Sequence, residues 1–202
     1  TTLLQAIEPN MELDLWLTDC LDAAVLEVNE DRWSFAHDKL RLGVLQQLTK
    51  DELRLLHTRI ASSMEQLYGS NTTHINLLAD HWGQAGNIER EAHYLILAAS
   101  EELRIGLYES AIKRFRRVLD IIERSDSRYI EIELNIAQAH LGRAEYDMAR
   151  DIYEQILNTL PASAKDSSAY TRMMLGDICV AQEKLEEARI SYLDSLSLYQ
   201  EI

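Results

Sequence analysis

Three segments in the second half of the chain repeat one pattern, and this repeat constrains the fold more than any other feature. The segments "GLYESAIKRF" (106–115), "AEYDMARDIY" (144–153) and "EKLEEARISY" (183–192) each place an Ala four residues before an aromatic residue. The shared Ala recurs after 38 and then 39 residues. Self-similarity at such a period is typical of stacked helical repeats. The alanines are Ala111, Ala149 and Ala188, and the aromatic residues are Phe115, Tyr153 and Tyr192.

A second small residue precedes each of these alanines by twelve positions, at Ala99, Ala137 and Gly176. The pattern therefore predicts two antiparallel helices per repeat, which approach closely where both carry a small residue, because a larger side chain would overpack the crossing. The aromatic residue lies one turn further along the same helix face. The predicted helices are 88–104, 108–124, 128–143, 146–159, 167–182 and 185–200, and they form the pairs 88–124, 128–159 and 167–200.

This arrangement resembles the tetratricopeptide repeat, whose signature has a small residue late in its first helix and Ala, then an aromatic residue, in its second. The family period is about 34 residues, so the excess is assigned to connections such as 159–168 or to longer helices. The early Trp position of the family holds Leu95, Glu133 and Arg172 here, and its Pro position is met only by Pro161. The resemblance implies a superhelix of helical hairpins.

Composition agrees with a helical chain. Apolar residues make up 47% of the sequence, and only 7 Gly and 2 Pro interrupt it. Good helix formers such as Ala, Leu, Glu, Arg and Gln are common. The fold class expected is all-α, with a helical-hairpin superhelix that follows a partial winged-helix unit containing one short β-hairpin. Because the sequence begins at Thr1 and stops at Ile202 within a predicted helix, we expect a piece of a longer protein.

The first half predicts a helix, a hairpin and a second helix. Helical spacing of Leu side chains covers 11–26, and "VLEV" (25–28) and "RWSF" (32–35) read as strands joined by the polar turn 29–31. A helix from Asp38 to about Leu48 follows. This helix–hairpin–helix order is interpreted as the closing half of a winged helix. Because a lone two-stranded hairpin is marginally stable, we expect the front half of that fold to matter. Thr49 and Glu52 then have the spacing of a capping box.

Three further segments carry a more specific resemblance. They are "WSFAHDKLR" (33–41), "LLHTRIA" (55–61) and "ADHWGQAGNIEREA" (79–92). Followed by a repeat array, they resemble one region of the signal-transduction ATPases with numerous domains, in which a nucleotide-binding core leads into a winged helix and a superhelical repeat array. The resemblance covers essentially the whole chain. It implies the end of a winged helix over 1–48, a helical connector over 49–91 and tetratricopeptide-like repeats over 92–202.

His37 has two interpretations. In relatives of the apoptosome and plant immune-receptor type, a Met-His-Asp motif occupies this place, and its His contacts the phosphates of bound ADP. The resemblance implies the same contact for His37 in a longer protein, although Ala36 stands at the Met position. The residues alone favour a local role, in which His37 packs or caps while Asp38 stabilises the helix N-terminus.

Charge and cysteine content limit the partners. The net charge is −14, and neither half of the chain is basic, which disfavours nucleic acid. DNA binding by the winged helix, as in a transcription regulator, remains the alternative. The basic run 113–117 is read as a solvated helix face beside acidic neighbours. Cys20 and Cys179 lie far apart, which favours a reducing, cytoplasmic location, and no membrane span or membrane partner is expected.

No catalytic chemistry is predicted. None of the five Lys residues is followed by Ser or Thr, so the chain lacks a phosphate-binding loop, and we expect no enzyme and no cofactor in this part. ATP or ADP would belong to a longer protein. His74 and His81 are seven residues apart, wider than the i, i+4 spacing of a helical metal pair, so no metal is expected. No Ser, His and Asp arrangement suggests a nucleophile.

The function expected is a non-catalytic regulatory or scaffold module that binds a protein segment or effector and couples it to a nucleotide-binding core. The first helices of the repeats would line the binding groove. The alternative, weighed equally, is that the repeats pack only against other domains of the same chain. The groove lacks the Lys and Asn that clamp a C-terminal carboxylate in some relatives. Its predicted residues are His93, Ile96, Ser100, Leu103, Arg104, Glu131, Leu134, Gln138, Leu141, Tyr170, Met173, Asp177 and Val180.

Overall fold

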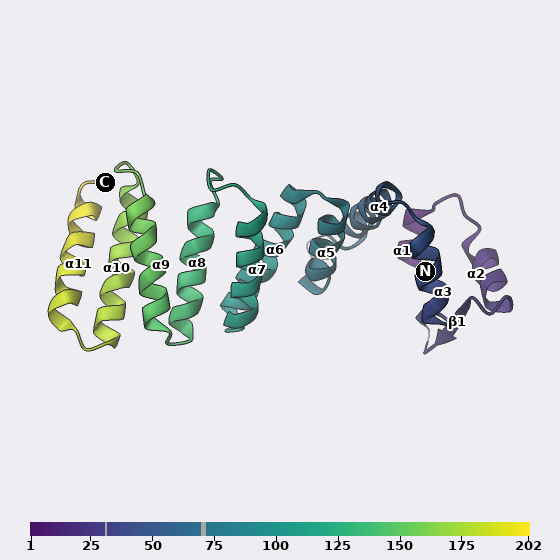
Figure 1. Ribbon diagram of the computed structural model, residues 1–202, viewed down its shortest axis with the longest axis horizontal. Helices are drawn as coiled ribbons and strands as arrows, with labels where there is room; N and C mark the ends of the chain where they lie inside the picture. The colour runs from purple at the N-terminus through teal and green to yellow at the C-terminus, as the bar shows by residue number, and fades with distance from the viewer. Residues whose placement is uncertain (31, 70–71) are drawn as a thin grey trace. The chain divides into compact units, whose positions relative to one another are not determined.

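The computed structural model describes residues 1–30, 32–69 and 72–202, and these residues are mostly helical (Figure 1). They form two compact units, 1–94 and 95–202, which are described separately below. The first unit contains α1 (Thr2–Ile7), α2 (Leu13–Asp22), β1 (Leu26–Asn29), β2 (Arg32–Phe35), α3 (Asp38–Gln47), α4 (Lys50–Tyr68), the short 3-10 helix η1 (Thr72–His74) and α5 (Ile75–Ala85). The second contains α7 (Tyr108–Ile121), α8 (Tyr129–Gly142), α9 (Tyr146–Thr159), α10 (Lys165–Ala181) and α11 (Leu185–Gln200). Helix α6 (Ile88–Arg104) contributes residues to both.

The predicted hairpin is present. Strands β1 and β2 pair antiparallel, with Val28 opposite Trp33. Of the predicted polar turn, Asp31 lies outside the described residues. The preceding helix is shorter than predicted, because α2 ends at Asp22 and Ala24 adopts a positive φ of 53° that turns the chain into β1. The helical spacing of Leu13, Leu17, Leu21 and Ala24 predicted a helix that reaches Ala24, and this was wrong at the C-terminal end.

Helix α4 begins with the predicted capping box. The hydroxyl of Thr49 accepts from the Glu52 backbone N–H, and the Glu52 carboxylate accepts from the Thr49 backbone N–H at 2.8 Å. These hydrogen bonds lower the pKa of Glu52. Helix α4 packs on α5, where the apolar face of α5 is buried. The division of this unit into a winged-helix part (1–48) and a connector (49–91) stays a prediction.

The second unit consists of the predicted helix pairs, and Figure 1 shows α8 to α11 side by side. The helices begin and end within three residues of the predicted bounds. The small residues are wedged between helices as expected: Ala99, Ala111, Ala137 and Ala149 are 0% exposed and Ala188 is 2% exposed. A core cluster around Ala137, Ala149 and Tyr153 joins the second repeat to Ile178 of the third. The fold is a tetratricopeptide-like stack of helical hairpins.

The turns inside the repeats are also equivalent. Gly106, Ala144 and Glu183 occupy the same position in the three repeats, and their φ angles are 82°, 58° and 60°. A left-handed residue here ends the first helix and starts the second. Only the first repeat supplies the Gly that this conformation favours.

In the described ranges 1–30, 32–69 and 72–202, no helix has the length together with the apolarity that crossing a bilayer requires.

Candidate functional site

The predicted groove residues all reach the surface. None of the thirteen side chains is buried, which is the condition for lining a binding face. His93 belongs to the first unit and is exposed. Leu134 is half-buried because it packs on the core cluster of the second repeat.

Five of the predicted residues line one hollow of about 630 Å³ in the second unit. They come from the C-terminal half of α6 and from α8. Three residues of the same hollow were missed by the sequence pattern, namely Tyr108, Asn135 and Gly142. Asn135 is four residues after Glu131, so helical spacing from a predicted groove residue could have found it. The five predicted residues are Ser100, Leu103, Arg104, Gln138 and Leu141.

The close approach of Tyr108 to Gly142 shapes one side of this hollow. A Cβ atom at position 142 would overlap the Tyr108 ring, so the ring lies directly on the glycine backbone. Tyr108 also lines a second hollow of about 550 Å³ beside the turn that follows α6. The ring therefore lines two surface depressions, and its position requires that residue 142 has no side chain.

Most polar side chains that line the 630 Å³ hollow make no hydrogen bond within the described part of the protein. Across the part of the chain that the structure describes, the side chains of Ser100, Asn135 and Gln138 make no hydrogen bond. Arg104 differs, because its guanidinium binds both carboxylate oxygens of Glu101 at 2.8 and 2.6 Å. This pairing lowers the pKa of Glu101. The hollow thus offers two amides and a hydroxyl beside the apolar surface of Leu103 and Leu141.

The predicted groove residues of the third repeat lie outside this hollow. Asp177 is committed, since its carboxylate accepts a hydrogen bond of 2.6 Å from the Tyr192 hydroxyl. That bond, with partial burial, raises the pKa of Tyr192 to about 12. Tyr170 and Met173 are half-buried, and Val180 is exposed. The structure therefore does not gather the whole predicted stripe into one site.

His37 lies at the N-cap position of α3 with an exposed side chain. Its backbone is extended, and its side chain makes no capping hydrogen bond. Asp38 is in the first helical turn and lies 3.5 Å from Arg41. The imidazole is accessible at a helix N-terminus, and its contact with nucleotide stays a prediction.

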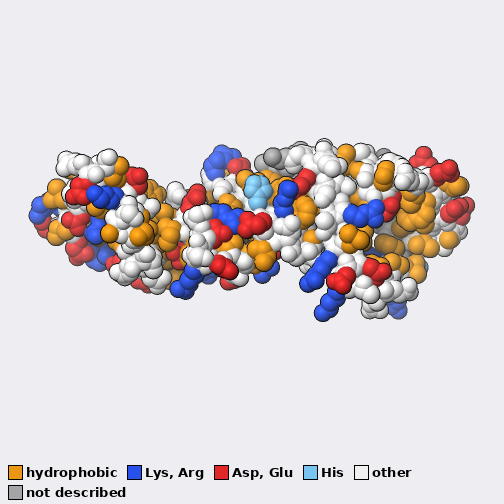
Figure 2. Space-filling model, turned by 90° about the horizontal axis from the view of Figure 1, so that it is seen from above, with side chains coloured by type: hydrophobic (Ala, Val, Ile, Leu, Met, Phe, Trp, Pro, Cys, Tyr) orange, Lys and Arg blue, Asp and Glu red, His pale blue; other side chains and the backbone are white. Residues whose placement is uncertain are grey.

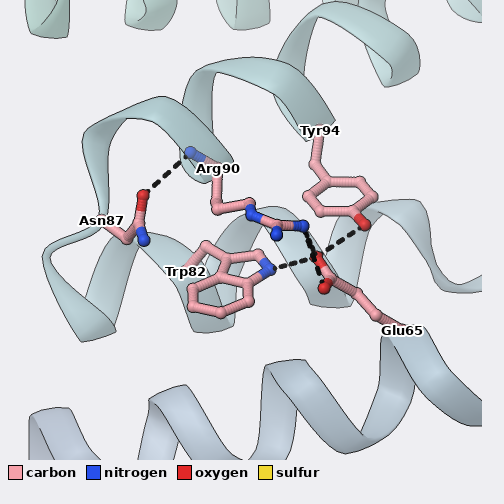
Figure 3. Close-up of polar contacts among 5 residues, drawn as sticks. All are labelled: Glu65, Trp82, Asn87, Arg90 and Tyr94. Atoms are coloured by element: carbon pink, nitrogen blue, oxygen red, sulfur yellow. Dashed lines mark hydrogen bonds and ion pairs between the residues drawn. The ribbon is translucent and has the colours of Figure 1, made fainter.

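A polar cluster in the first unit explains the "AGNIEREA" segment structurally (Figure 3). The Glu65 carboxylate of α4 accepts from Trp82 Nε1 at 2.9 Å, from the Tyr94 hydroxyl at 2.8 Å and from Arg90 at 2.8 Å. Burial and the Glu65 contact raise the pKa of Tyr94 to about 12. The Asn87 side chain accepts from the Arg90 backbone N–H, which caps α6. The cluster ties α4, α5 and α6 together, which is a structural role.

His74 and His81, the two histidines with a spacing of seven residues, contact different side chains. His74 lies against the Tyr68 ring, with centroids 4.3 Å apart, whereas His81 Nδ1 lies 2.9 Å from His57 Nδ1. In the ranges that the structure covers, no group of three or more His, Cys, Asp or Glu side chains is arranged to hold a metal ion.

Acidic and basic side chains intermingle on the face that Figure 2 shows. Basic side chains of the run 113–117 also have acidic neighbours. Lys113 Nζ lies 2.9 Å from Glu109, and Arg114 Nε lies 2.9 Å from Glu102 on α6. Lys113 and Arg114 therefore have the acidic neighbours that the sequence indicated for this run.

Comparisons with known proteins support the fold alone. No family model matches the chain, and no curated protein matches it. The structure titled "MamA RS-1 ArsTM double mutant" is similar over 100% of this chain and 97% of its own, with 9% identity and a TM-score of 0.51. "Crystal structure of MamA" has 15% identity, covers 81% and 94%, and has a TM-score of 0.47. "MamA 41-end from Desulfovibrio magneticus RS-1" has 11% identity, covers 81% and 93%, and has a TM-score of 0.45. The first alignment agrees with a tetratricopeptide-like repeat fold.

Proposed function

We propose that this chain is a non-catalytic scaffold that binds an extended segment of a partner protein in the 630 Å³ hollow between α6 and α8. The observation that carries the proposal is the set of uncommitted polar groups, Ser100, Asn135 and Gln138, beside an apolar lining. Binding pockets commonly combine apolar walls with a few convergent polar groups that fix the orientation of the ligand. An extended peptide offers backbone N–H and C=O groups that amide side chains can satisfy.

The test is a peptide selection against this hollow. A library of random peptides would be selected on the wild-type chain, and the dissociation constant of each selected peptide would be measured on the Asn135→Ala/Gln138→Ala double variant. We expect an affinity about 5- to 150-fold weaker for that variant, since loss of hydrogen bonds to both amides costs about 1–3 kcal/mol. The control variant is Glu154→Gln, at an exposed position of α9. Equal affinity for wild type and double variant would contradict the proposal.

A finer role is proposed for the first unit, as part of a signalling ATPase in which a winged helix relays the nucleotide state. Two things support it: the resemblance of 33–41 and 79–92, and the exposed apolar surface of α2 and α3. Leu15, Leu42 and Val44 are 59%, 46% and 52% exposed, so apolar side chains of α2 and α3 are available for contact with a neighbouring domain.

His37 provides the test of this finer role. In a longer natural protein that carries the nucleotide-binding core, His37→Ala is expected to accelerate ADP release, because the imidazole would no longer contact the phosphates. Asp38→Asn is the matched control for local helix-end stability. Unchanged ADP release in the His37 variant would leave no support for the nucleotide contact, and would favour the alternative that the unit only packs against neighbouring domains.

A further inference from the structure

A third hollow, about 590 Å³ in volume, lies at the opposite end of helix α8 from the 630 Å³ hollow. It is lined by residues of the α7–α8 connection, the start of α8 and the end of α9. Its lining shares no residue with the 630 Å³ hollow. The lining residues are Arg124, Tyr129, Ile130, Glu133, Gln155, Asn158 and Thr159.

Glu133 is the unusual member of this set. Its side chain is half-buried, and within the described ranges no hydrogen-bond donor or cation is in direct contact with its carboxylate. Burial raises the pKa of Glu133, and the positive charge of Arg124 nearby lowers it by less. A carboxylate that loses hydration without gaining a partner is unfavourable, because desolvation penalises its charged form.

The equivalent positions of the other two repeats show which side chains occupy the place of Glu133 there. Leu95, Glu133 and Arg172 are equivalent residues of the three first helices, and Arg117, Gln155 and Asp194 are equivalent residues of the three second helices. In the third repeat, Arg172 lies 3.2 Å from Asp194, so the slot contains an ion pair. In the first repeat, Leu95 is buried and apolar, so the first-helix position carries no charge.

Among the residues that the structure describes, the second repeat has at this position a carboxylate with no cation in direct contact. Glu133 and Gln155 occupy the positions of the third-repeat ion pair, yet neither supplies a positive charge, and both line the hollow. The amides of Gln155 and Asn158 are exposed at its rim and add carbonyl acceptors. Tyr129 and Ile130 provide apolar surface for the methylene groups of a long side chain.

We propose that this hollow binds an arginine or lysine side chain of a protein segment, with its cationic head at Glu133 and the amides of Gln155 and Asn158. The net charge of −14 on the whole chain favours the approach of such a basic segment. Arg124 stands at the rim and opposes a second cation, so it limits the affinity. The site is independent of the peptide-binding hollow proposed above.

The test is an NMR titration of the 202-residue chain with a blocked peptide, acetyl-Gly-Arg-Gly-amide. The control peptide contains citrulline, which has the shape of arginine without its charge. We expect arginine-dependent shifts at Tyr129, Glu133 and Asn158, and at least a tenfold lower affinity for the citrulline peptide. Glu133→Gln is expected to weaken arginine binding at least tenfold while keeping or raising the melting temperature, and Arg124→Ala is expected to strengthen it.

A second variant places the ion pair of the third repeat into the second. Glu133→Arg/Gln155→Asp should fill the hollow from within and abolish arginine binding in a chain that stays folded. The Asn135→Ala/Gln138→Ala variant should leave the titration unchanged, which separates this proposal from the proposed function. Equal binding of the citrulline peptide, equal binding by Glu133→Gln, or shifts confined to other surfaces would each overturn the proposal.

Discussion

The Tyr192 ring lies directly over Gly176. A Cβ atom on Gly176 would stand 2.6 Å from Cε1 of that ring, closer than carbon atoms can pack. The first and second repeats have Ala at this position, at Ala99 and Ala137, so the third repeat has exchanged a methyl group for close contact with an aromatic ring. Tyr192 is held there by its hydrogen bond to Asp177.

Gly176→Ala should therefore destabilise the chain, by about 1–3 kcal/mol, since the added methyl forces the ring to move. The measurement is urea unfolding followed by circular dichroism. In a Tyr192→Leu background the same change should cost clearly less, because the flexible Leu side chain can give way. Equal costs in both backgrounds would show that Gly176 and Tyr192 do not interact as described.

Ala149→Phe should overpack the crossing of α8 and α9. Ala149 is 0% exposed and belongs to the core cluster with Ala137 and Tyr153. We expect a loss of about 1–3 kcal/mol in the free energy of unfolding. Ala181→Phe is the control, because Ala181 is exposed at the end of α10. A melting temperature of Ala149→Phe as high as that of the control would contradict the repeat packing.

Tyr153→Phe should stabilise the second repeat. The Tyr153 side chain is 0% exposed, and its hydroxyl has no hydrogen-bond partner in the described structure. Burial raises the pKa of this hydroxyl. The equivalent Phe115 fills its site without a hydroxyl. We therefore expect the free energy of unfolding, measured with urea, to increase by about 1 kcal/mol.

Tyr192→Phe is the matched control for that change, because it removes the same atom where the hydroxyl donates to Asp177. It should lower stability by about 1 kcal/mol. A loss of stability in Tyr153→Phe as well would indicate that its hydroxyl has a partner in solution, and the assignment of a buried unpaired group would then be wrong.

The His57–His81 contact should make the first unit less stable in mild acid. Burial, and then the neighbouring His57, lowers the pKa of His81 below its usual 6.5. Below about pH 6.5 the unfolded chain then binds more protons than the folded chain, so the free energy of unfolding falls as the pH decreases. Protonating both rings would also place two N–H donors face to face at 2.9 Å.

The measurement is the melting temperature between pH 8 and pH 5.5. His81→Gln should flatten this dependence, and His93→Gln, at an exposed position, should leave it as in the wild type. The carboxylates whose pKa values are lowered, such as Glu101, titrate below this window and do not contribute to it. A wild-type profile that does not change between pH 7 and pH 5.5 would contradict the prediction.

The sequence predicted the helical repeats well because their signal is local and periodic. Ala111 and Phe115 are one turn apart on one helix, so their spacing alone indicates a shared face. The capping box of Thr49 and Glu52 was equally local. The end of α2 could not be predicted from a local signal, because the left-handed turn at Ala24 depends on how the hairpin leaves the helix.

The candidate sites were only partly predictable. The repeat register identified Ser100 and Gln138 as surface residues, but it could not show that they share a hollow with Tyr108. Nor could it show that, among the described residues, no cation is in direct contact with the Glu133 carboxylate, although the position of Glu133 in the register was known. Periodic side-chain size decides, by itself, which faces of successive helices can nest. Which polar groups then meet, and which are left without a partner, depends on distances between helices, and only the tertiary structure sets those distances.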